Sequence, residues 1–417
     1  MMERIFSRAD ILLPRDCDLT RWSVVACDQF TAQPEYWAAL EQLAEGVPST
    51  LHLMLPEAYL DRCDPLREAQ RINAEMRRCL ASGVFRALPD SYIYIERTLR
   101  SGVLRRGLLG VLDLEAYDYA ADSKSPIRAT EGTVESRLPP RVQVRRGAAL
   151  EMPHVMVFFD DPANSVLGAV DREKAALPVV YDFDLSAGGG HIKGVQLTGA
   201  AADRVDAALD ALAEAAYATD ETPLLFAMGD GNHSLATAKK CWEELKPTLT
   251  PAQRETHPAR YSLVELVNIH DPAICFEPIH RVCFDTAPAD FLTAAEQFFA
   301  ARSLPGANRH TIRCVTAEGE RSAAVTGRTI GEVIAAAEEF CRSYTETHGG
   351  RIDYIHNDDT ALELGRKPGS AALLLPRMEK GELFSSVRSS GPFPKKSFSI
   401  GHAEDKRYYL ECREIGG

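Results

Sequence analysis

The stretch from Leu224 to Leu245, LLFAMGDGNHSLATAKKCWEEL, constrains the fold of this chain most strongly. Five apolar residues, 224–228, run into the polar turn 229–233 (GDGNH), and a helical pattern follows at once. This order predicts a buried strand, a tight turn and a helix that begins with polar residues. Because glycine has no side chain, Gly229 and Gly231 permit backbone angles and close approaches that other residues would block.

The predicted turn has the chemistry of a phosphate site. The first turn of a helix has backbone N–H groups without intrahelical partners and carries a partial positive charge. A strand, a glycine turn and a helix N-terminus therefore make a ready phosphate site. The candidate ligands are Gly229, Gly231, Asn232 and Ser234. Asp230 and His233 add an acid–base pair or a metal-binding pair, although Asp230 or Asn232 would equally serve as an ordinary helix cap.

The segment GDGNHSLATA resembles the DGHHR-type loop of the ParB/sulfiredoxin-like superfamily. The resemblance implies a nucleotide-binding core in which a strand-to-helix turn cradles phosphates. Members of this superfamily include CTP-binding partition proteins, sulfiredoxin and an ADP-dependent free serine kinase. One position departs from the loop, because Ser234 stands where an arginine usually follows the histidine. A phosphate-binding arginine must then come from elsewhere in the chain, or the chemistry differs.

Composition is that of an ordinary globular protein, with 417 residues, 45% hydrophobic and 26% charged. The net charge of −13 disfavours nucleic acid as a partner, although a local basic pocket can still bind a phosphorylated small molecule. No signal-peptide core and no membrane-length apolar run occur, so we expect a cytoplasmic protein without membrane contact. A homo-oligomer is compatible with the sequence, which does not fix the oligomeric state.

A polar stretch, 123–146, carries six lysines and arginines and has no apolar periodicity. Long polar loops of this kind are often functional. Arg128 and Arg137 are suited to bidentate binding of phosphate, and Glu131 between them is a candidate base. We expect Arg128 and Arg137 to approach the turn 229–233. The alternative is a solvated surface loop with internal ion pairs.

Other charged residues interrupt or end apolar segments. Asp160, in the segment 154–162, would hold Mg²⁺ at a strand end or make the turn before Pro162. Asp28 is open to the same two interpretations, as site residue or turn residue. Glu265 lies in an apolar run where an unpaired carboxylate would be costly, so it is either paired or functional. Arg281 is a further candidate for the missing arginine.

Alternating strand-like and helix-like segments predict an α+β (mixed α/β) fold, with mixed sheets flanked by helices. We divide the chain into an N-terminal α/β region (1–150) with the basic loop, a core (151–290) with the GDGNH turn, and a C-terminal α/β region (291–417). The glycine-rich loop 188–194 fits a lid, a second phosphate contact or a plain hairpin turn.

Six segments spread over the chain together resemble the domain of unknown function 1015 family. They are WSVVACDQFTAQPEYW, SPIRATEGTVESRLPPR, YDFDLSAGGGHIKGVQLTG, FAMGDGNHSLATAKK, PARYSLVELVNIHDPAICFEPIHR and KKSFSIGHAEDKRYYLE. Members of this family have also been labelled partition-protein-like, which agrees with the loop resemblance. The related free serine kinase implies a link to serine.

These features favour a nucleotide-binding enzyme, a kinase-type phosphotransferase acting on a small hydroxylated metabolite such as free serine. The turn 229–233 would hold the phosphates of ATP or ADP, and an arginine would neutralise developing charge. Asp230 or Glu131 would accept the hydroxyl proton, with His233 assisting, and Mg²⁺ would bind Asp230 or Asp160. Two alternatives stay open: a non-catalytic nucleotide-sensing module of the partition-protein type, and a phosphoserine hydrolase.

Overall fold

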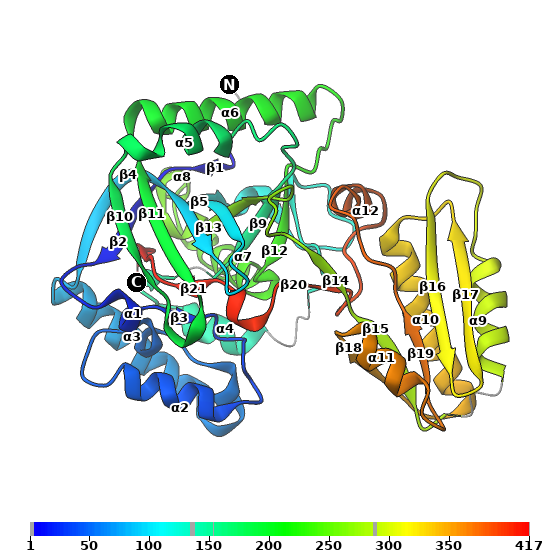
Figure 1. Cartoon of the computed structure of the whole chain (residues 1–417). Coiled ribbons are helices and arrows are strands. Elements are labelled where there is room, and N and C mark those ends of the chain that lie inside the picture. The colour runs from blue at the N-terminus through cyan, green and yellow to red at the C-terminus, as the bar shows by residue number, and fades with distance from the viewer. Residues whose placement is uncertain (1–3, 134–137, 153, 287–289, 417) are drawn as a thin grey trace. The chain divides into compact units, whose positions relative to one another are not determined.

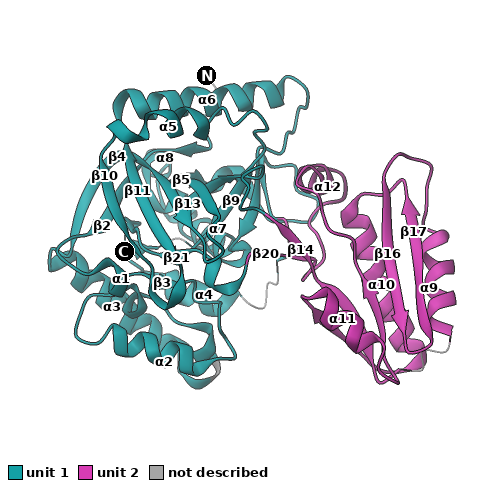
Figure 2. Cartoon of the chain, in the orientation of Figure 1, with its two compact units in different colours: residues 1–129, 133–274, 402–417 teal, residues 130–132, 275–401 magenta. Residues whose placement is uncertain are grey.

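The structure is a computed structural model that describes residues 4–133, 138–152, 154–286 and 290–416. The chain divides into two compact units (Figure 2). The first unit comprises Met1–Ala129, Thr133–Ile274 and His402–Gly417, and the second comprises Thr130–Gly132 and Cys275–Gly401. This division differs from the three regions expected from the sequence. Strands from 1–150 and 151–290 interleave in one sheet, and the C-terminal segment returns to the first unit.

The first unit is built on one large mixed sheet (Figure 1). Its strands are β1 (Phe6–Ser7), β2 (Ala9–Pro14), β4 (Phe85–Thr98), β5 (Leu104–Asp113), β6 (Tyr117–Asp118), β7 (Ile127–Arg128), β9 (Met156–Phe159), β10 (Val179–Asp184), β11 (His191–Leu197), β12 (Phe226–Asp230) and β13 (Tyr261–Asn268). The main path runs β10-β11-β4-β5-β13-β9-β12-β7-β6, while β1 pairs with β5 and β2 with β4. The pair β13–β9 and the pair β12–β7 are parallel, and β12–β9 is antiparallel.

Helices and short strands complete the first unit. The helices are α1 (Leu19–Trp22), α2 (Pro34–Leu43), α3 (Pro65–Ala81), α4 (Leu138–Arg145), α5 (Leu167–Glu173), α6 (Gly199–Tyr217), α7 (Asn232–Leu245) and α8 (Pro251–Thr256). Short 3₁₀ helices lie at Thr50–Leu53, Glu57–Arg62, Leu114–Ala116, Lys174–Ala176, Ser186–Gly188, Lys246–Thr248, Pro258–Arg260 and Ala403–Asp405. Two short strand pairs join β3 (Val24–Val25) to β21 (Tyr408–Tyr409), and β8 (Leu150–Glu151) to β22 (Arg413–Glu414).

Both faces of the large sheet are buried. Ile93 and Ile95 of β4 pack into an apolar cluster with residues of α2 and α3. Tyr92 and Tyr94 of the same strand point into a second cluster, which contains residues of α5, α6 and α7. This alternation follows from strand geometry, in which successive side chains point to opposite faces. The mixed α/β fold expected from the sequence is confirmed.

The second unit has its own sheet. Its strands are β14 (Phe276–Pro278), β15 (His280–Phe284), β16 (Arg309–Thr316), β17 (Gly319–Thr326), β18 (Arg351–Ile355), β19 (Ala371–Leu374) and β20 (Phe398–Ile400). Five of them follow the order β17-β16-β19-β15-β18, and β14 pairs with β20. The helices are α9 (Phe291–Ala300), α10 (Ile330–His348), α11 (Asp358–Gly365) and α12 (Glu382–Ser390).

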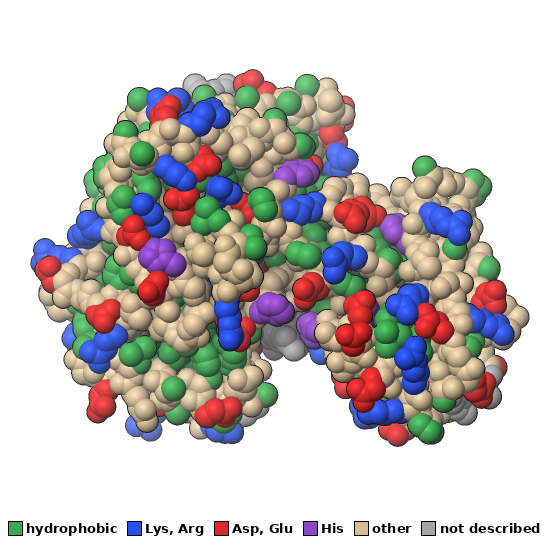
Figure 3. All heavy atoms as spheres, viewed as in Figure 1, with side chains coloured by type: hydrophobic (Ala, Val, Ile, Leu, Met, Phe, Trp, Pro, Cys, Tyr) green, Lys and Arg blue, Asp and Glu red, His purple; other side chains and the backbone are tan. Residues whose placement is uncertain are grey.

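On the face drawn in Figure 3, Lys and Arg side chains are interspersed with Asp and Glu. Charges of opposite sign are therefore mixed on that face rather than gathered by sign.

Among the residues that the structure describes, no helix combines the length and the apolar character needed to cross a membrane.

The glycine-rich segment 188–194 is the end of the β10–β11 hairpin. His191 already belongs to β11, opposite Asp184 in the ladder. Gly190 has a φ of +80°, and a Cβ there would lie 2.1 Å from the carbonyl oxygen of Thr98. The His191 ring bonds Asp184 through Nδ1 at 2.8 Å and Asp182 through Nε2 at 2.7 Å. Of the three roles considered for this segment, the geometry matches the hairpin turn.

We expect the imidazole of His191 to titrate above its ordinary pKa of about 6.5. The hydrogen bond with Asp184 raises the pKa most, Asp182 adds to it, and partial burial acts in the opposite direction. The stabilisation of the folded state by protonated His191 is thus present below the pKa of His191 in the unfolded chain, and it is lost as pH rises through the pKa in the folded protein. NMR titration should show the raised midpoint, and Asp184→Asn should lower it. The same titration in unfolding urea is the control, and equal midpoints in both states would contradict the expectation.

Candidate functional site

The segment that opened the sequence analysis folds as expected. β12 ends at Asp230, Gly231 is the N-cap, and α7 begins at Asn232, so His233 lies in its first turn. The apolar residues Leu224, Phe226, Ala227 and Met228 are buried. The predicted strand, turn and helix are therefore confirmed, with the strand two residues later than the apolar run. Gly231 makes no side-chain cap, which leaves the helix N-terminus without a capping oxygen from that position.

Both glycines of the turn are required by packing against β9. Gly231 has a φ of +79°, and a Cβ there would lie 3.2 Å from the Cα of Val155. A Cβ on Gly229 would lie 2.9 Å from the ring of Phe158. The absence of side chains lets the start of α7 approach the neighbouring strand closely, and a left-handed φ favours glycine at position 231.

Lys406 brings a positive charge to this turn. Its Nζ lies 3.2 Å from Oδ2 of Asp230, and the two side chains are only 17% and 18% exposed. The other oxygen of Asp230, Oδ1, accepts the N–H of Gly231 at 2.9 Å. A cation therefore stands beside the N-terminus of α7 although Ser234 occupies the usual arginine position. It comes from the C-terminal segment, 176 residues beyond Asp230 in numbering.

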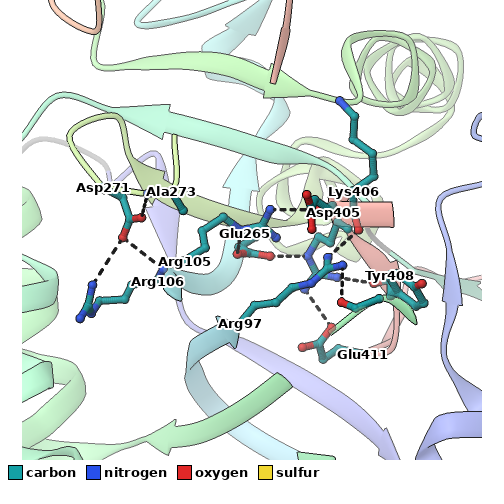
Figure 4. A network of polar contacts seen from close by, with 12 residues as sticks. Arg97, Arg105, Arg106, Glu265, Asp271, Ala273, Asp405, Lys406, Tyr408 and Glu411 are labelled. Carbon is teal, nitrogen blue, oxygen red and sulfur yellow. Dashed lines mark hydrogen bonds and ion pairs between the residues drawn. The ribbon is translucent and has the colours of Figure 1, made fainter. Parts of the chain in front are cut away.

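Buried arginines hold the backbone that carries Lys406 (Figure 4). Arg97 donates through Nη1 to the carbonyl of Lys406 at 2.5 Å and through Nη2 to that of Glu404 at 2.8 Å. Arg105 donates to the carbonyl of Asp405 at 3.1 Å. Burial and the charge of Arg105 lower the pKa of Arg97 to about 9, so the group stays protonated at neutral pH. Three successive carbonyls are thus fixed by side chains of the sheet.

Glu265 on β13 is the acidic counterpart of these arginines. It is 2% exposed, accepts from Nε of Arg407 at 2.7 Å, and lies 3.8 Å from Nε of Arg105. Burial favours the neutral acid, but Arg105 and Arg407 outweigh it and lower the pKa of Glu265. Gly107 makes room for the carboxylate, because a Cβ there would lie 2.3 Å from Oε1 of Glu265. Of the two roles considered for Glu265, the structure shows ion pairing.

A chain of hydrogen bonds connects α7 to the C-terminal strand. Ser234 Oγ lies 3.1 Å from Nε2 of His154, and the other ring nitrogen, Nδ1, lies 2.9 Å from the hydroxyl of Tyr409. Tyr409 also accepts the N–H of Cys27 at 3.4 Å. Burial raises the pKa of the Tyr409 phenol well above its ordinary value, so it is neutral at physiological pH. The imidazole is therefore held between two hydroxyl groups.

Asp28 interacts electrostatically both with Lys406 and with His154 of the hydrogen-bond chain. Burial alone would raise the pKa of Asp28, but His154, a hydrogen bond from Gln29 and the charge of Lys406 lower it below its ordinary value. The carboxylate is therefore ionised at neutral pH. Asp28 follows the short strand β3, which pairs with β21 of the C-terminal segment. This pairing brings residue 28 to the site from the far end of the sequence.

Two of the arginines expected at the turn, Arg128 and Arg281, bond backbone carbonyls. Arg128 is buried and donates to the carbonyls of Ser125 at 2.7 Å and Thr222 at 2.8 Å. Thr222 precedes β12, so this guanidinium lies at the end of β12 opposite the turn, contrary to the expected approach. Arg137 lies outside the described residues. Arg281, in the second unit, is fully buried and donates to Glu338 at 2.8 Å and to two backbone carbonyls.

Each of the remaining candidate acids has a partner of its own. Asp160 pairs with His270 at 2.7 Å. It follows β9, which runs antiparallel to β12, so Asp160 and Asp230 lie at opposite ends of this strand pair. Glu131 belongs to the second unit, where its Oε1 accepts the N–H of Lys396 at 3.0 Å. Within the described ranges, no group of three or more His, Cys, Asp or Glu side chains is arranged to hold a metal ion.

Residues 10–348 match the family model described as "Protein of unknown function (DUF1015)". The chain belongs to the DUF1015 family. The family membership expected from the six sequence segments is thereby confirmed. No curated protein matches this DUF1015 chain in sequence.

Solved structures show a distant likeness in fold. Free serine kinase in complex with AMP has a TM-score of 0.36 at 8% identity, covering 73% of this chain and 90% of that chain. A conserved hypothetical protein from Pyrococcus furiosus has a TM-score of 0.31 at 9% identity, covering 72% and 97%. SbnI with C-terminal truncation from Staphylococcus aureus has a TM-score of 0.34 at 9% identity, covering 70% and 83%. At these values the function must be argued from the site itself.

Besides Glu265, Arg407 pairs with the buried carboxylate of Glu411 at 2.9 Å. We expect Arg407→Met to destabilise the first unit by about 3–5 kcal/mol, because both carboxylates would lose a buried ionic partner. Urea unfolding followed by tryptophan fluorescence measures this, since Trp22, Trp37 and Trp242 all lie in the first unit.

The matched control is Arg146→Met, which removes an exposed arginine 2.6 Å from Glu244 within the same unit. Its cost should stay within about 0.5 kcal/mol. Adding Glu265→Gln to Arg407→Met should cost less than the sum of the single variants, because the two side chains are coupled. An Arg407→Met variant as stable as the control would contradict the assignment.

Proposed function

We propose that the protein binds a nucleotide at the turn between β12 and α7 and transfers a phosphoryl group to the hydroxyl of a small metabolite. The observation that carries the proposal is the Lys406 ammonium, 3.2 Å from Asp230 beside the N-terminus of α7. A helix N-terminus and an adjacent ammonium together attract a phosphate group. Lysine serves in such sites as a point charge.

Asp230 fits a magnesium ion shared with phosphate. Mg²⁺ is commonly bound by one or two protein carboxylates, with phosphate oxygens and water supplying the other ligands. With phosphate as the partner of Lys406, the Asp230 oxygen that faces Lys406 would be available to hold the metal. Bound Mg²⁺ would neutralise part of the charge on the phosphates.

The reaction would be an in-line displacement at the terminal phosphorus. The hydroxyl oxygen of the acceptor forms the new P–O bond, and the bond to the leaving nucleotide oxygen breaks. The hydroxyl proton passes to the ionised carboxylate of Asp28, while Lys406 and the start of α7 stabilise negative charge on the phosphates. His233, in the first turn of α7, is the candidate for assisting this proton transfer.

Nucleotide binding should stabilise the folded protein. At a hundred times the dissociation constant, the gain is about 2.7 kcal/mol. Thermal unfolding with ATP, ADP and CTP, each with and without Mg²⁺, measures it. Lys406→Met should weaken binding tenfold or more, because a charge-assisted contact to phosphate is lost.

Lys240→Met, which removes a lysine from a later turn of α7, is the matched control and should bind as the wild type does. Gly231→Val should abolish binding, because a β-branched residue resists a φ of +79°. The nucleotide proposal fails if none of the three nucleotides shifts the unfolding of the wild type, or if Lys406→Met binds normally.

Substitution of the proton acceptor should reduce turnover more than it reduces nucleotide binding. We expect Asp28→Asn to reduce phosphoryl transfer by about a hundredfold or more while nucleotide binding survives. His233→Ala should show the same separation if His233 assists. The measurement follows labelled phosphate from nucleotide to acceptor, with serine among the acceptors tested.

The fate of the label separates this proposal from its alternatives. Label appearing only as inorganic phosphate would indicate a hydrolase, as a phosphoserine hydrolase would also show with phosphoserine as substrate. Nucleotide binding without any turnover would indicate a nucleotide-sensing module instead of an enzyme.

A further inference from the structure

A cavity of about 170 Å³ lies within the first unit, next to the turn of α7. Its wall is mainly apolar and includes Leu53, Met76, Val144, Ala148, Val155 and Leu263. The side chains come from α3, α4, β13 and the segments beside them. A cavity of about 150 Å³ lined by aliphatic and aromatic side chains holds one benzene molecule. This cavity therefore fits a phenyl or a branched alkyl group.

One part of the wall is polar and is the hydroxyl–imidazole chain described above. His154, Ser234, Thr237 and Tyr409 all line the cavity. Ser234 and Thr237 lie three residues apart on α7, so they share a face of the helix. Thr237 Oγ1 donates to the carbonyl of His233 at 2.7 Å, so this hydroxyl is already engaged within α7. Ser234 bonds His154 side chain to side chain, and its hydroxyl oxygen keeps a lone pair that can accept from a hydroxyl of a ligand.

The charged groups in the wall neutralise one another. Arg145 bonds Glu151 at 2.7 Å, and Arg141 forms an ion pair with Glu57. A ligand with its own charges would have to break these pairs or bury charge without a partner, and both are costly. The occupant of this cavity is therefore an uncharged group.

We propose that the cavity binds the apolar body of the acceptor, a small neutral alcohol with a phenyl or branched alkyl group. Its hydroxyl lies at Ser234 and His154, which both line the cavity and bond each other. Only the phosphorylation of this hydroxyl rests on the proposed function, since binding of the alcohol does not need nucleotide. Free serine, with an ammonium and a carboxylate, fits this cavity poorly.

The test uses the full chain without nucleotide and three probes: benzyl alcohol, toluene and serine. Calorimetric titration should show benzyl alcohol binding most tightly, toluene more weakly, and serine at least tenfold more weakly than benzyl alcohol. Ala148→Met, which fills the cavity, should weaken benzyl alcohol at least tenfold. Ala208→Met, which adds the same atoms on α6 outside the cavity, should not. Should Ala148→Met fail to fold, Val144→Leu on α4 tests the same volume.

Ser234→Ala tests the contact to the hydroxyl of the ligand separately from the contact to its apolar body. It should reduce the affinity for benzyl alcohol several-fold and leave toluene unchanged, because only the alcohol offers a hydroxyl. The proposal is overturned if neither aromatic probe binds, if serine binds more tightly than benzyl alcohol, or if Ala148→Met and Val144→Leu bind both probes normally.

A ³¹P NMR assay with ATP and Mg²⁺ then examines the bound alcohol. Binding without phosphorylation would reject the proposed transfer and keep the cavity assignment. Phosphorylation of serine without binding of either aromatic probe would support the proposed transfer and reject the cavity assignment.

Discussion

The buried carboxylate of Glu265 is the constraint on which the rest of the first unit depends. A carboxylate at 2% exposure in a central strand is tolerated only with ionic partners, and desolvation costs several kcal/mol for each ion. Arg105 provides one partner from the sheet, and Arg407 provides the other from the C-terminal segment. That segment is therefore bound to the sheet by charge as well as by the short β3–β21 pairing. Because Lys406 precedes Arg407 directly, the pairing of Glu265 also fixes where the cation of the site lies.

The candidate site is accordingly assembled from segments that are far apart in sequence. Residues 28, 154, 230–234 and 406–409 meet because strand pairing brings them together. The turn 229–233 could be predicted because its signals are local: an apolar run, two glycines and a helical period. Lys406, His154 and Tyr409 could not, because nothing near them in sequence marks them as neighbours of that turn. The departure at Ser234 was a usable signal, because it indicated either that an arginine came from elsewhere in the chain or that the chemistry differed.

The same distinction between local and long-range information explains where the structure departs from the expectations. Arg128 and Arg281 were chosen for their chemistry, yet each guanidinium bonds backbone carbonyls, which the sequence does not reveal. The three expected regions followed the order of the chain, whereas the sheet joins strands from 1–150 with strands from 151–290. Glu265 was more informative, because a charge within an apolar run carries a cost wherever it is buried. Its need for a partner could be foreseen, although Arg407 could not be named.

Helix α7 and the turn before it contact a charged group on one side and an apolar cavity on another, through residues that are close in sequence. The turn before it, at Asp230 and Gly231, faces the ammonium of Lys406, while Ser234 and Thr237 face the apolar cavity. A helix places residues three or four apart on one face, so both contacts follow from one rigid element. The proposed phosphate contact depends on backbone and on glycine conformation, which leaves little freedom for substitution at positions 229 and 231. Much of the cavity wall, by contrast, consists of side chains from α3, α4 and the segments beside them. In the proposed function, selection among acceptors would therefore reside in those side chains, and the handling of phosphate would reside in the turn.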